Sequence, residues 1–161
     1  MPDKRELRRN LRAKRLAMTA GEVRSKSQVI ADKLMETVDW PRVRTMHIYV
    51  SRAEWNEADT APVIQLVRRH WPGVRIVQPP PKPDQALPEE KFDLIIIPCL
   101  GFDKERHRLG LGGGWYDRFL ARQPRALKIG LVFQNGLIKD GLPREPHDIR
   151  LDKIITEMAI H

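Results

Sequence analysis

Cysteine and histidine, the residues that build disulfide frameworks and many metal sites, are scarce in this sequence. A single cysteine, Cys99, occurs in 161 residues, and no two of the five histidines are four residues apart. One cysteine excludes an internal disulfide and a cysteine-rich zinc site, and the histidine spacing excludes a helix-face metal motif. Nothing in the sequence requires an oxidising compartment, so we expect a cytoplasmic protein.

Long apolar segments are also missing. The longest nearly apolar run, residues 94–102, is far shorter than the roughly 20 residues that a membrane-spanning helix needs. The N-terminus alternates charged residues with leucine and lacks the apolar core of a secretory signal. We therefore expect no membrane partner. Hydrophobic residues make up 41% and charged residues 31% of the chain, which favours a globular fold, and the length fits one domain over residues 1–161.

Positive charge is present and unevenly distributed. The chain carries a formal net charge of +8, but residues 1–15 alone hold seven Lys or Arg against Asp3 and Glu6. A basic segment at one end indicates a localised anionic partner or a solvated helix face, rather than a surface that binds nucleic acid throughout. Binding of nucleic acid by this segment remains an alternative. It is disfavoured because no aromatic residues are interleaved with the lysines and arginines.

Hydrophobic spacing predicts two helices at the start of the chain. Leu7 and Leu11 lie four residues apart, which favours an amphipathic helix over residues 4–17 that docks by its leucines and exposes a cationic face. Thr19 begins a capping-box pattern, and apolar residues follow it at helical intervals, which predicts a second helix over residues 20–38.

The rest of the chain alternates between strands and helices. Further helices are predicted to begin at Asp59 or Thr60 and to cover residues 114–122. Strands are predicted at residues 46–50, 74–77, 93–97, 127–133 and 152–156. This alternation favours an α/β fold, here a single three-layer Rossmann-like domain with a mainly parallel sheet and a basic N-terminal helix. Residues 78–88 interrupt the pattern with five of the 13 prolines, and we expect an extended, polyproline-like surface linker there rather than a peptide ligand.

A glycine-rich segment follows the most apolar strand. Glycines at 110, 112, 113 and 114 stand between that strand and the helix predicted over residues 114–122. Ligands of α/β sheets bind at the carboxyl ends of the strands, and glycines let backbone N–H groups approach an anion closely. The pattern is neither a phosphate-binding P-loop nor a dinucleotide fingerprint, because Trp115 stands where the last glycine of the fingerprint would be. We expect a phosphate cradle, with a purely structural turn as the alternative.

Residues beside the glycines strengthen the phosphate interpretation. Arg106 and Arg108 precede the loop and can bind phosphate oxygens through several donors. Asp117 could hold Mg²⁺ against a phosphate or could interact only with the start of its helix. Tyr116 could stack on a flat ring or belong to the core.

Residues 101–103 (Gly-Phe-Asp) and 108–117 (Arg-Leu-Gly-Leu-Gly-Gly-Gly-Trp-Tyr-Asp) together resemble the signature of the 5-formyltetrahydrofolate cyclo-ligase family. Residues 4–8, 57–60 and 147–152 resemble further stretches of that family in the same order. The resemblance implies an ATP- and Mg²⁺-dependent ligase of one-carbon metabolism that converts 5-formyltetrahydrofolate into 5,10-methenyltetrahydrofolate, releasing ADP and phosphate. It implies a small-molecule substrate, and we expect a monomer.

The resemblance also assigns roles to individual residues. It implies two catalytic residues, Arg108 and Tyr116, and two metal ligands, Asp117 and Asp148. The implied ATP-binding residues are Lys4, Arg5, Arg8, Arg108, Leu109, Gly110, Leu111, Gly112, Gly113, Gly114, Trp115 and Tyr116. The implied folate-binding residues are Arg8, Glu57, Asp59, Leu111, Gly112, Gly113, Gly114 and Trp115.

One segment departs from the family pattern. Members typically have a longer stretch between the strands predicted here at residues 74–77 and 93–97, with a hairpin near the folate pocket, whereas this chain has only the linker of residues 78–88. From this we expect a complete nucleotide half and a reduced folate half. A relative that binds nucleotide or folate but has lost turnover is therefore the alternative to an active cyclo-ligase.

Overall fold

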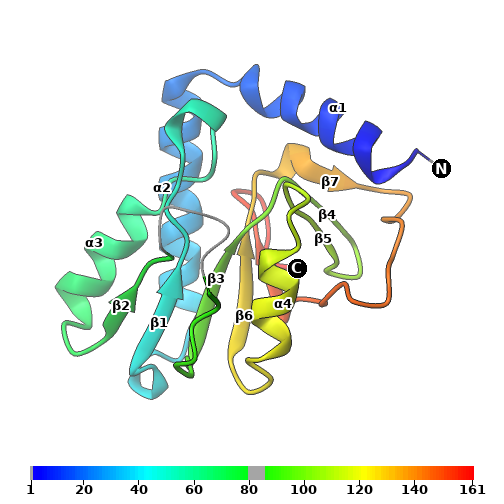
Figure 1. The fold of residues 1–161 in the computed structure, drawn as a ribbon. Coiled ribbons are helices and arrows are strands. Elements are labelled where there is room, and N and C mark those ends of the chain that lie inside the picture. The colour runs from blue at the N-terminus through cyan, green and yellow to red at the C-terminus, as the bar shows by residue number, and fades with distance from the viewer. Residues whose placement is uncertain (1, 80–85) are drawn as a thin grey trace.

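A computed structural model describes residues 2–79 and 86–161. Its centre is a parallel sheet of five strands in the order β2-β1-β3-β6-β8 (Figure 1). The strands of this sheet are β1 (Thr45–Ile48), β2 (Arg75–Val77), β3 (Leu94–Pro98), β6 (Leu127–Leu131) and β8 (Lys153–Ile155). The α/β prediction is confirmed, and each strand lies within two residues of its predicted bounds. The linker prediction rests largely on residues 80–85, which lie outside the described residues.

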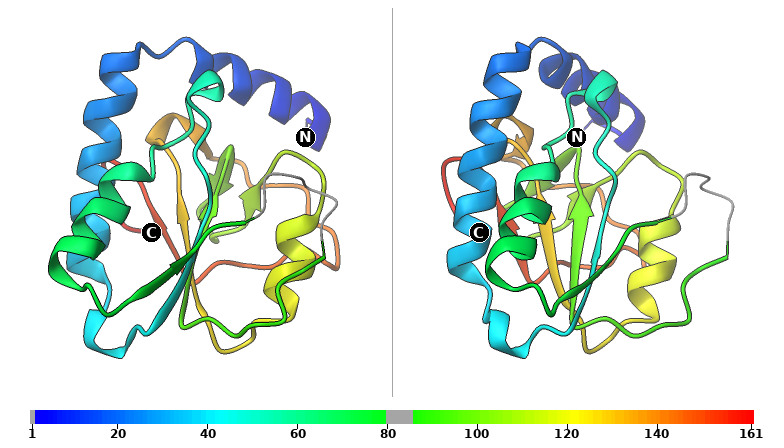
Figure 2. Two further views of the ribbon diagram at one scale, coloured as in Figure 1. Left: turned by 60° about the vertical axis from the view of Figure 1, so that its left-hand side comes forward. Right: turned by 90° about the vertical axis from the view of Figure 1, so that its left-hand side faces the viewer.

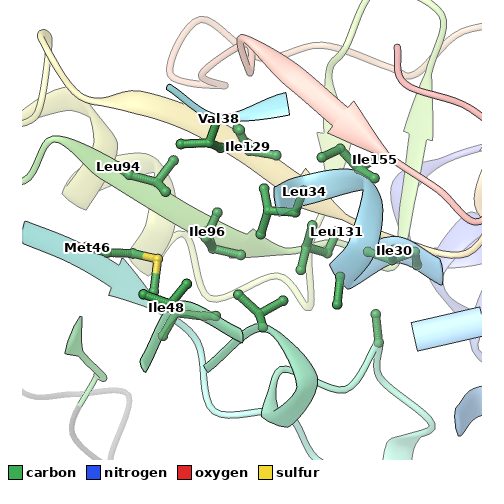
Figure 3. Packing of buried hydrophobic residues seen from close by; sticks show 14 of the residues in the cluster. Ile30, Leu34, Val38, Met46, Ile48, Leu94, Ile96, Ile129, Leu131 and Ile155 are labelled. Atoms are coloured by element: carbon green, nitrogen blue, oxygen red, sulfur yellow. The ribbon is translucent and has the colours of Figure 1, made fainter. Parts of the chain in front are cut away.

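Helices cover both faces of the sheet, which gives the expected three layers (Figure 2). One face is covered by α2 (Ala20–Thr37) and α3 (Ala61–His70), and the other by the short α4 (Trp115–Ala121). Side chains alternate along each strand, so Ile96 points to α2 and α3 whereas its neighbours in β3 point to α4. Figure 3 shows the larger core, where Ile30 and Leu34 of α2 pack on the strands.

The start of α2 follows the predicted capping box. The Thr19 hydroxyl accepts a hydrogen bond from the N–H of Glu22, and the Glu22 carboxylate accepts one from the N–H of Thr19. These two bonds satisfy backbone donors that a helix start leaves free. The local sequence therefore fixes where this helix begins.

A second, small sheet was not predicted. It consists of β4 (Gly101–Asp103), β5 (Arg108–Leu109) and β7 (Leu137–Ile138), in the order β5-β4-β7. Buried Asp103 organises the β4–β5 turn by accepting hydrogen bonds from the N–H groups of Glu105 and His107. Strands of two or three residues are too short to show a periodic pattern, so hydrophobic spacing could not predict them.

The basic N-terminal helix, α1 (Lys4–Leu16), lies across the end of the sheet where β3 leads into the small sheet (Figure 1). Its buried Leu7 and Leu11 pack in a cluster with Leu100, Leu109 and Leu142, as the leucine spacing predicted. Short 3₁₀ turns η1 (Trp40–Arg42), η2 (Ala53–Trp55) and η3 (Gln134–Gly136) complete the described elements. None of the described helices combines the length and apolar character needed to cross a membrane.

Candidate active site

The glycine-rich loop connects β5 to α4, and its glycines fall into two kinds. Gly112 and Gly114 have positive φ angles of 109° and 65°, which side chains rarely adopt. Gly110 and Gly113 have no such angle, and a Cβ at either would meet nothing within 4 Å. A structural turn explains the first pair but not the second, whose open surroundings leave room for a ligand to approach the backbone.

Arg8 of α1 reaches this loop. Its Nε donates a hydrogen bond to the carbonyl oxygen of Gly110 at 2.9 Å, and a Cβ on Gly112 would lie 3.3 Å from its Cζ. The structure thus brings together two segments, 102 positions apart, that the resemblance assigned to ATP binding. Arg5 lies on the exposed side of α1, where it borders a shallow pocket of about 420 Å³ with Arg8, Arg9 and Arg12.

The first turn of α1 contacts the loop that contains Asp148. Lys4 Nζ lies 2.7 Å from Asp148 Oδ2 and 2.8 Å from Glu145 Oε2. Burial is the largest single effect and works against both charges, but the hydrogen bonds and opposite charges around them together outweigh it, so the pKa of Lys4 is raised and the pKa of Asp148 is lowered. The pair therefore stays ionised over the neutral range.

Asp117 lies beside the same segment. Its Oδ1 accepts hydrogen bonds from Arg108 Nη1 at 2.9 Å and from the N–H of Ile149 at 3.2 Å. Because Ile149 follows Asp148, the two predicted metal ligands lie on adjoining segments. Among the described residues, no hydrogen-bond donor contacts Oδ2 of Asp117 or Oδ1 of Asp148. Carboxylate oxygens are the ligands that Mg²⁺ prefers, so the donor set fits this ion.

The loop before Asp148 offers a second set of possible ligands. Donor atoms of Glu145, His147 and Asp148 lie within 4.8 Å of one another, and the first two residues are exposed. The Nε2 atom of His147 lies 3.6 Å from Glu145 Oε2. Exposed groups of this kind occur without metal, so the arrangement alone assigns no further ion.

The aromatic residues of the signature pack inward. The Trp115 ring lies 5.0 Å from that of Phe119 and 6.1 Å from that of His47, and Leu109 is buried. Trp115 and Leu109 therefore place their side chains in the hydrophobic clusters, whereas Leu111 is 44% exposed beside the glycines. Their roles in ATP or folate binding stay predictions.

Tyr116 lies in the first turn of α4 and is partly buried against both hydrophobic clusters. Burial, and to a smaller extent the negative charge of Glu57, raise the pKa of Tyr116, while Arg108 acts in the opposite direction. The phenol is therefore neutral at pH 7 and can donate a hydrogen bond. Tyr116 also interacts electrostatically with Arg108, which precedes the glycine-rich loop, and with Cys99, which follows β3.

Glu57 and Asp59, the predicted folate contacts, differ in their surroundings. Glu57 is 7% exposed, its Oε2 accepts a hydrogen bond from the N–H of Arg52 at 2.8 Å, and burial raises its pKa. Asp59 Oδ1 instead accepts hydrogen bonds from the Ser51 hydroxyl and the N–H of Ala61, which stabilises the start of α3. A structural role accounts for these contacts of Asp59, and its folate contact stays a prediction.

Arg15 is a buried charge that the sequence interpretation missed. It is 5% exposed and donates a hydrogen bond from Nε to the carbonyl oxygen of Trp55 at 2.8 Å. The signal was present, because Arg15 follows Leu7 and Leu11 at four-residue intervals on the buried stripe of α1. Cys99 and His47 are also buried: burial raises the pKa of Cys99 to about 12 and lowers that of His47 to about 4.

Comparison with known proteins gives a consistent result. The model of the 5-formyltetrahydrofolate cyclo-ligase family matches residues 1–76 and 66–157. The 5-formyltetrahydrofolate cyclo-ligase of Mycoplasma pneumoniae is 31% identical, covering 96% of this chain and 99% of that protein. The mitochondrial 5-formyltetrahydrofolate cyclo-ligase of Arabidopsis thaliana is 25% identical, covering 98% and 75%. The solved structure of a 5,10-methenyltetrahydrofolate synthetase from M. pneumoniae superposes with a TM-score of 0.80 at 26% identity, covering 97% of this chain and 99% of that one.

Proposed function

Because this chain belongs to the 5-formyltetrahydrofolate cyclo-ligase family, we propose that it uses ATP to convert 5-formyltetrahydrofolate into 5,10-methenyltetrahydrofolate, with release of ADP and phosphate. The observation that carries the proposal is the convergence of Arg8, the open glycines and the two aspartates at one end of the sheet. These groups come from three distant parts of the chain, and together they suit the phosphates and metal ion of a nucleoside triphosphate.

The chemistry explains why such a site is needed. A formamide oxygen is a poor leaving group, so transfer of the γ-phosphoryl group to that oxygen activates the formyl carbon. N10 then attacks this carbon and loses its proton, and the C–O bond breaks with departure of phosphate. Phosphoryl transfer depends mainly on alignment and charge neutralisation.

On the nucleotide side, we assign the phosphates to Lys4, Arg8, Arg108 and the backbone of the glycine-rich loop. Asp117 and Asp148 would hold Mg²⁺, whose chemistry is to neutralise phosphate charge. In the structure, Arg108 and Lys4 pair with these carboxylates. The same two cations can turn to phosphate oxygens when the carboxylates take a metal ion.

On the folate side, we assign Glu57 and Tyr116 to the reduced pterin. An ionised Glu57 can accept hydrogen bonds from ring N–H groups, and the neutral Tyr116 phenol can donate to an acceptor on the substrate. Glu57 is buried and Tyr116 is partly buried, and low exposure strengthens hydrogen bonds to a bound ligand.

The two alternatives have less support. The expectation of a reduced folate half rested on the short middle segment, yet the M. pneumoniae cyclo-ligase is matched over 99% of its length by this chain. Nucleic-acid binding rested on the basic segment, but Lys4, Arg8 and Arg15 make their contacts within the fold.

The test is to follow formation of methenyltetrahydrofolate by absorbance, with and without MgATP. The proposal requires product only when 5-formyltetrahydrofolate, ATP and Mg²⁺ are all present, with ADP and product formed in equal amounts. MgATP that raises the melting temperature without any product would instead support a binding relative without turnover.

A further inference from the structure

Arg15 occupies a position where an apolar residue would be expected. It lies on the buried stripe of α1 after Leu7 and Leu11, and it is 5% exposed. A buried guanidinium loses its hydration, and this loss must be offset by hydrogen bonds or an opposite charge. Burial accordingly lowers the pKa of Arg15, although arginine remains charged at any physiological pH.

The hydrogen bonds of Arg15 only partly satisfy it. Nε donates to the carbonyl oxygen of Trp55 at 2.8 Å, and Nη1 has a long contact of 3.5 Å with that of Cys99. Nη2 is buried and has no hydrogen-bond partner in the described part of the chain. This arrangement is expensive for a residue that only fills space, since leucine would fit the pattern of the helix stripe.

The segment that accepts the Arg15 hydrogen bond also donates hydrogen bonds back to the end of α1. Asn56, with a positive φ of 49°, donates from Nδ2 to the carbonyl oxygens of Arg15 at 3.0 Å and Met18 at 2.9 Å. Residues 55 and 56 are therefore fixed to the last turn of α1 by contacts in both directions. The next residue in the chain is Glu57.

Glu57 is the carboxylate that opposes the Arg15 charge. It supplies the largest favourable charge interaction for Arg15, although the two side chains form no ion pair within 4.0 Å among the residues described. An interaction at this range favours the ionised form of Glu57 while leaving its oxygens free of a direct bond to the guanidinium.

We propose that Arg15 is a positioning residue for folate binding: it holds residues 55–57 against α1 and supplies the charge that lets Glu57 face the substrate as a carboxylate. This role rests on the proposed function, which assigns Glu57 to the pterin. Arg15 itself does not touch the substrate.

The surroundings of Glu57 determine how its ionisation responds. Positive groups are Arg15 from α1 and Arg52 from its own loop, and Glu54 adds a negative charge. Tyr49, after β1, and Tyr116 of α4 also interact with it. Burial is the largest effect and raises the pKa of Glu57, against which Arg15 acts. Loss of the Arg15 charge must therefore raise this pKa further, so that protonation begins at higher pH.

The experiment compares Arg15→Gln, which keeps hydrogen-bond donors but no charge, with Arg15→Lys, which keeps the charge. For Arg15→Gln we expect the KM for 5-formyltetrahydrofolate to rise about tenfold at neutral pH, with the KM for MgATP nearly unchanged. The acidic limb of kcat/KM for folate should move up by about one pH unit, the effect of a nearby opposite charge. Arg15→Lys should restore the limb, and exposed Lys14→Gln on the same helix is the matched control.

A Glu57→Gln background isolates the cause. In that background, Arg15→Gln should produce no further shift of the acidic limb, because the titrating carboxylate is gone. A folded Arg15→Gln variant with wild-type folate KM and pH profile would overturn the proposal. So would an equal loss in Arg15→Gln and Arg15→Lys accompanied by equal rises in both KM values, which would indicate a structural role. Wild-type protein without turnover would contradict the proposed function itself, so the two failures are distinguishable.

Discussion

The carboxyl groups beside the two ends of α1 have pKa values that are shifted in opposite directions. At its first turn, Asp148 is in direct contact with Lys4 and its pKa is lowered. At its last turn, Glu57 has no cation within 4.0 Å among the described ion pairs, and its pKa is raised by burial. The difference shows that an ion pair supported by further hydrogen bonds and charges outweighs burial, whereas a charge at longer range only reduces its effect. One end suits phosphates and a metal ion, and the other suits the polar edge of a ring.

The largest expected effect comes from removing Arg108, the arginine that forms an ion pair with the proposed metal ligand Asp117. Arg108→Met should lower kcat/KM by about 10²- to 10³-fold, because it deletes a donor for transferring phosphate and leaves the part-buried Asp117 without its ion pair. Steady-state kinetics would measure the loss, and exposed Arg125→Met, after α4, is the control. A loss below about threefold would remove Arg108 from the catalytic assignment.

A smaller effect is expected in the glycine-rich loop, where a side chain can block the approach of ATP without straining the backbone. Gly113→Val places its side chain in open space, so we expect an unchanged melting temperature but an ATP affinity at least about tenfold weaker. Gly73→Val, where a Cβ also meets nothing within 4 Å, is the control in a turn remote from the site. Calorimetric titration would measure ATP binding. Gly112→Val is a poorer probe, since its φ of 109° and its contact with Arg8 add strain. Equal ATP affinity in Gly113→Val and wild type would contradict the cradle.

The metal assignment predicts a change of several-fold in the Mg²⁺ requirement. Asp148→Asn removes one of the two proposed ligands and frees Lys4, so half-maximal activity should need several times more Mg²⁺. The exposed Asp140→Asn variant controls for the loss of one surface charge. A Mg²⁺ titration that is unchanged for Asp148→Asn would exclude this residue as a ligand.

The smallest effect concerns stability at the Glu57 end. A carboxyl whose folded pKa is raised destabilises the protein above that pKa, and the penalty disappears as the pH falls below its unfolded pKa near 4.3. Glu57→Gln should therefore raise the melting temperature slightly at neutral pH, but not in acid, while weakening folate binding. Thermal unfolding at several pH values would measure this. A variant that is less stable at neutral pH would contradict the raised pKa.

The opposite sign is expected at the Asp148 end. A carboxyl with a lowered pKa contributes stability above its unfolded pKa, and this contribution is lost as the pH falls through the folded value. Asp148→Asn should therefore lower the melting temperature at neutral pH and have little effect in acid. Identical pH dependence for the two variants would remove the contrast between the ends of α1.

Much of the fold could be read from the sequence because short-range patterns determined it. The Thr19 capping box begins α2 as predicted, and the leucines of α1 are buried as their spacing required. The apolar run at 94–97 lies in the middle of the sheet. The small sheet escaped prediction because its strands are too short to show a period and depend on contacts with β7, far along the chain.

By itself, the sequence determined the order of the main strands and helices and the resemblance to a folate enzyme, since these depend on neighbouring residues or on motif spacing. Only the tertiary structure decided which distant charges meet. Lys4 contacts Asp148 across 144 positions, and Arg15 contacts the backbone of Trp55 across 40. Such pairs form because docking of the α1 leucines brings the two ends of the helix to different loops, and no local pattern encodes which loop each end will reach.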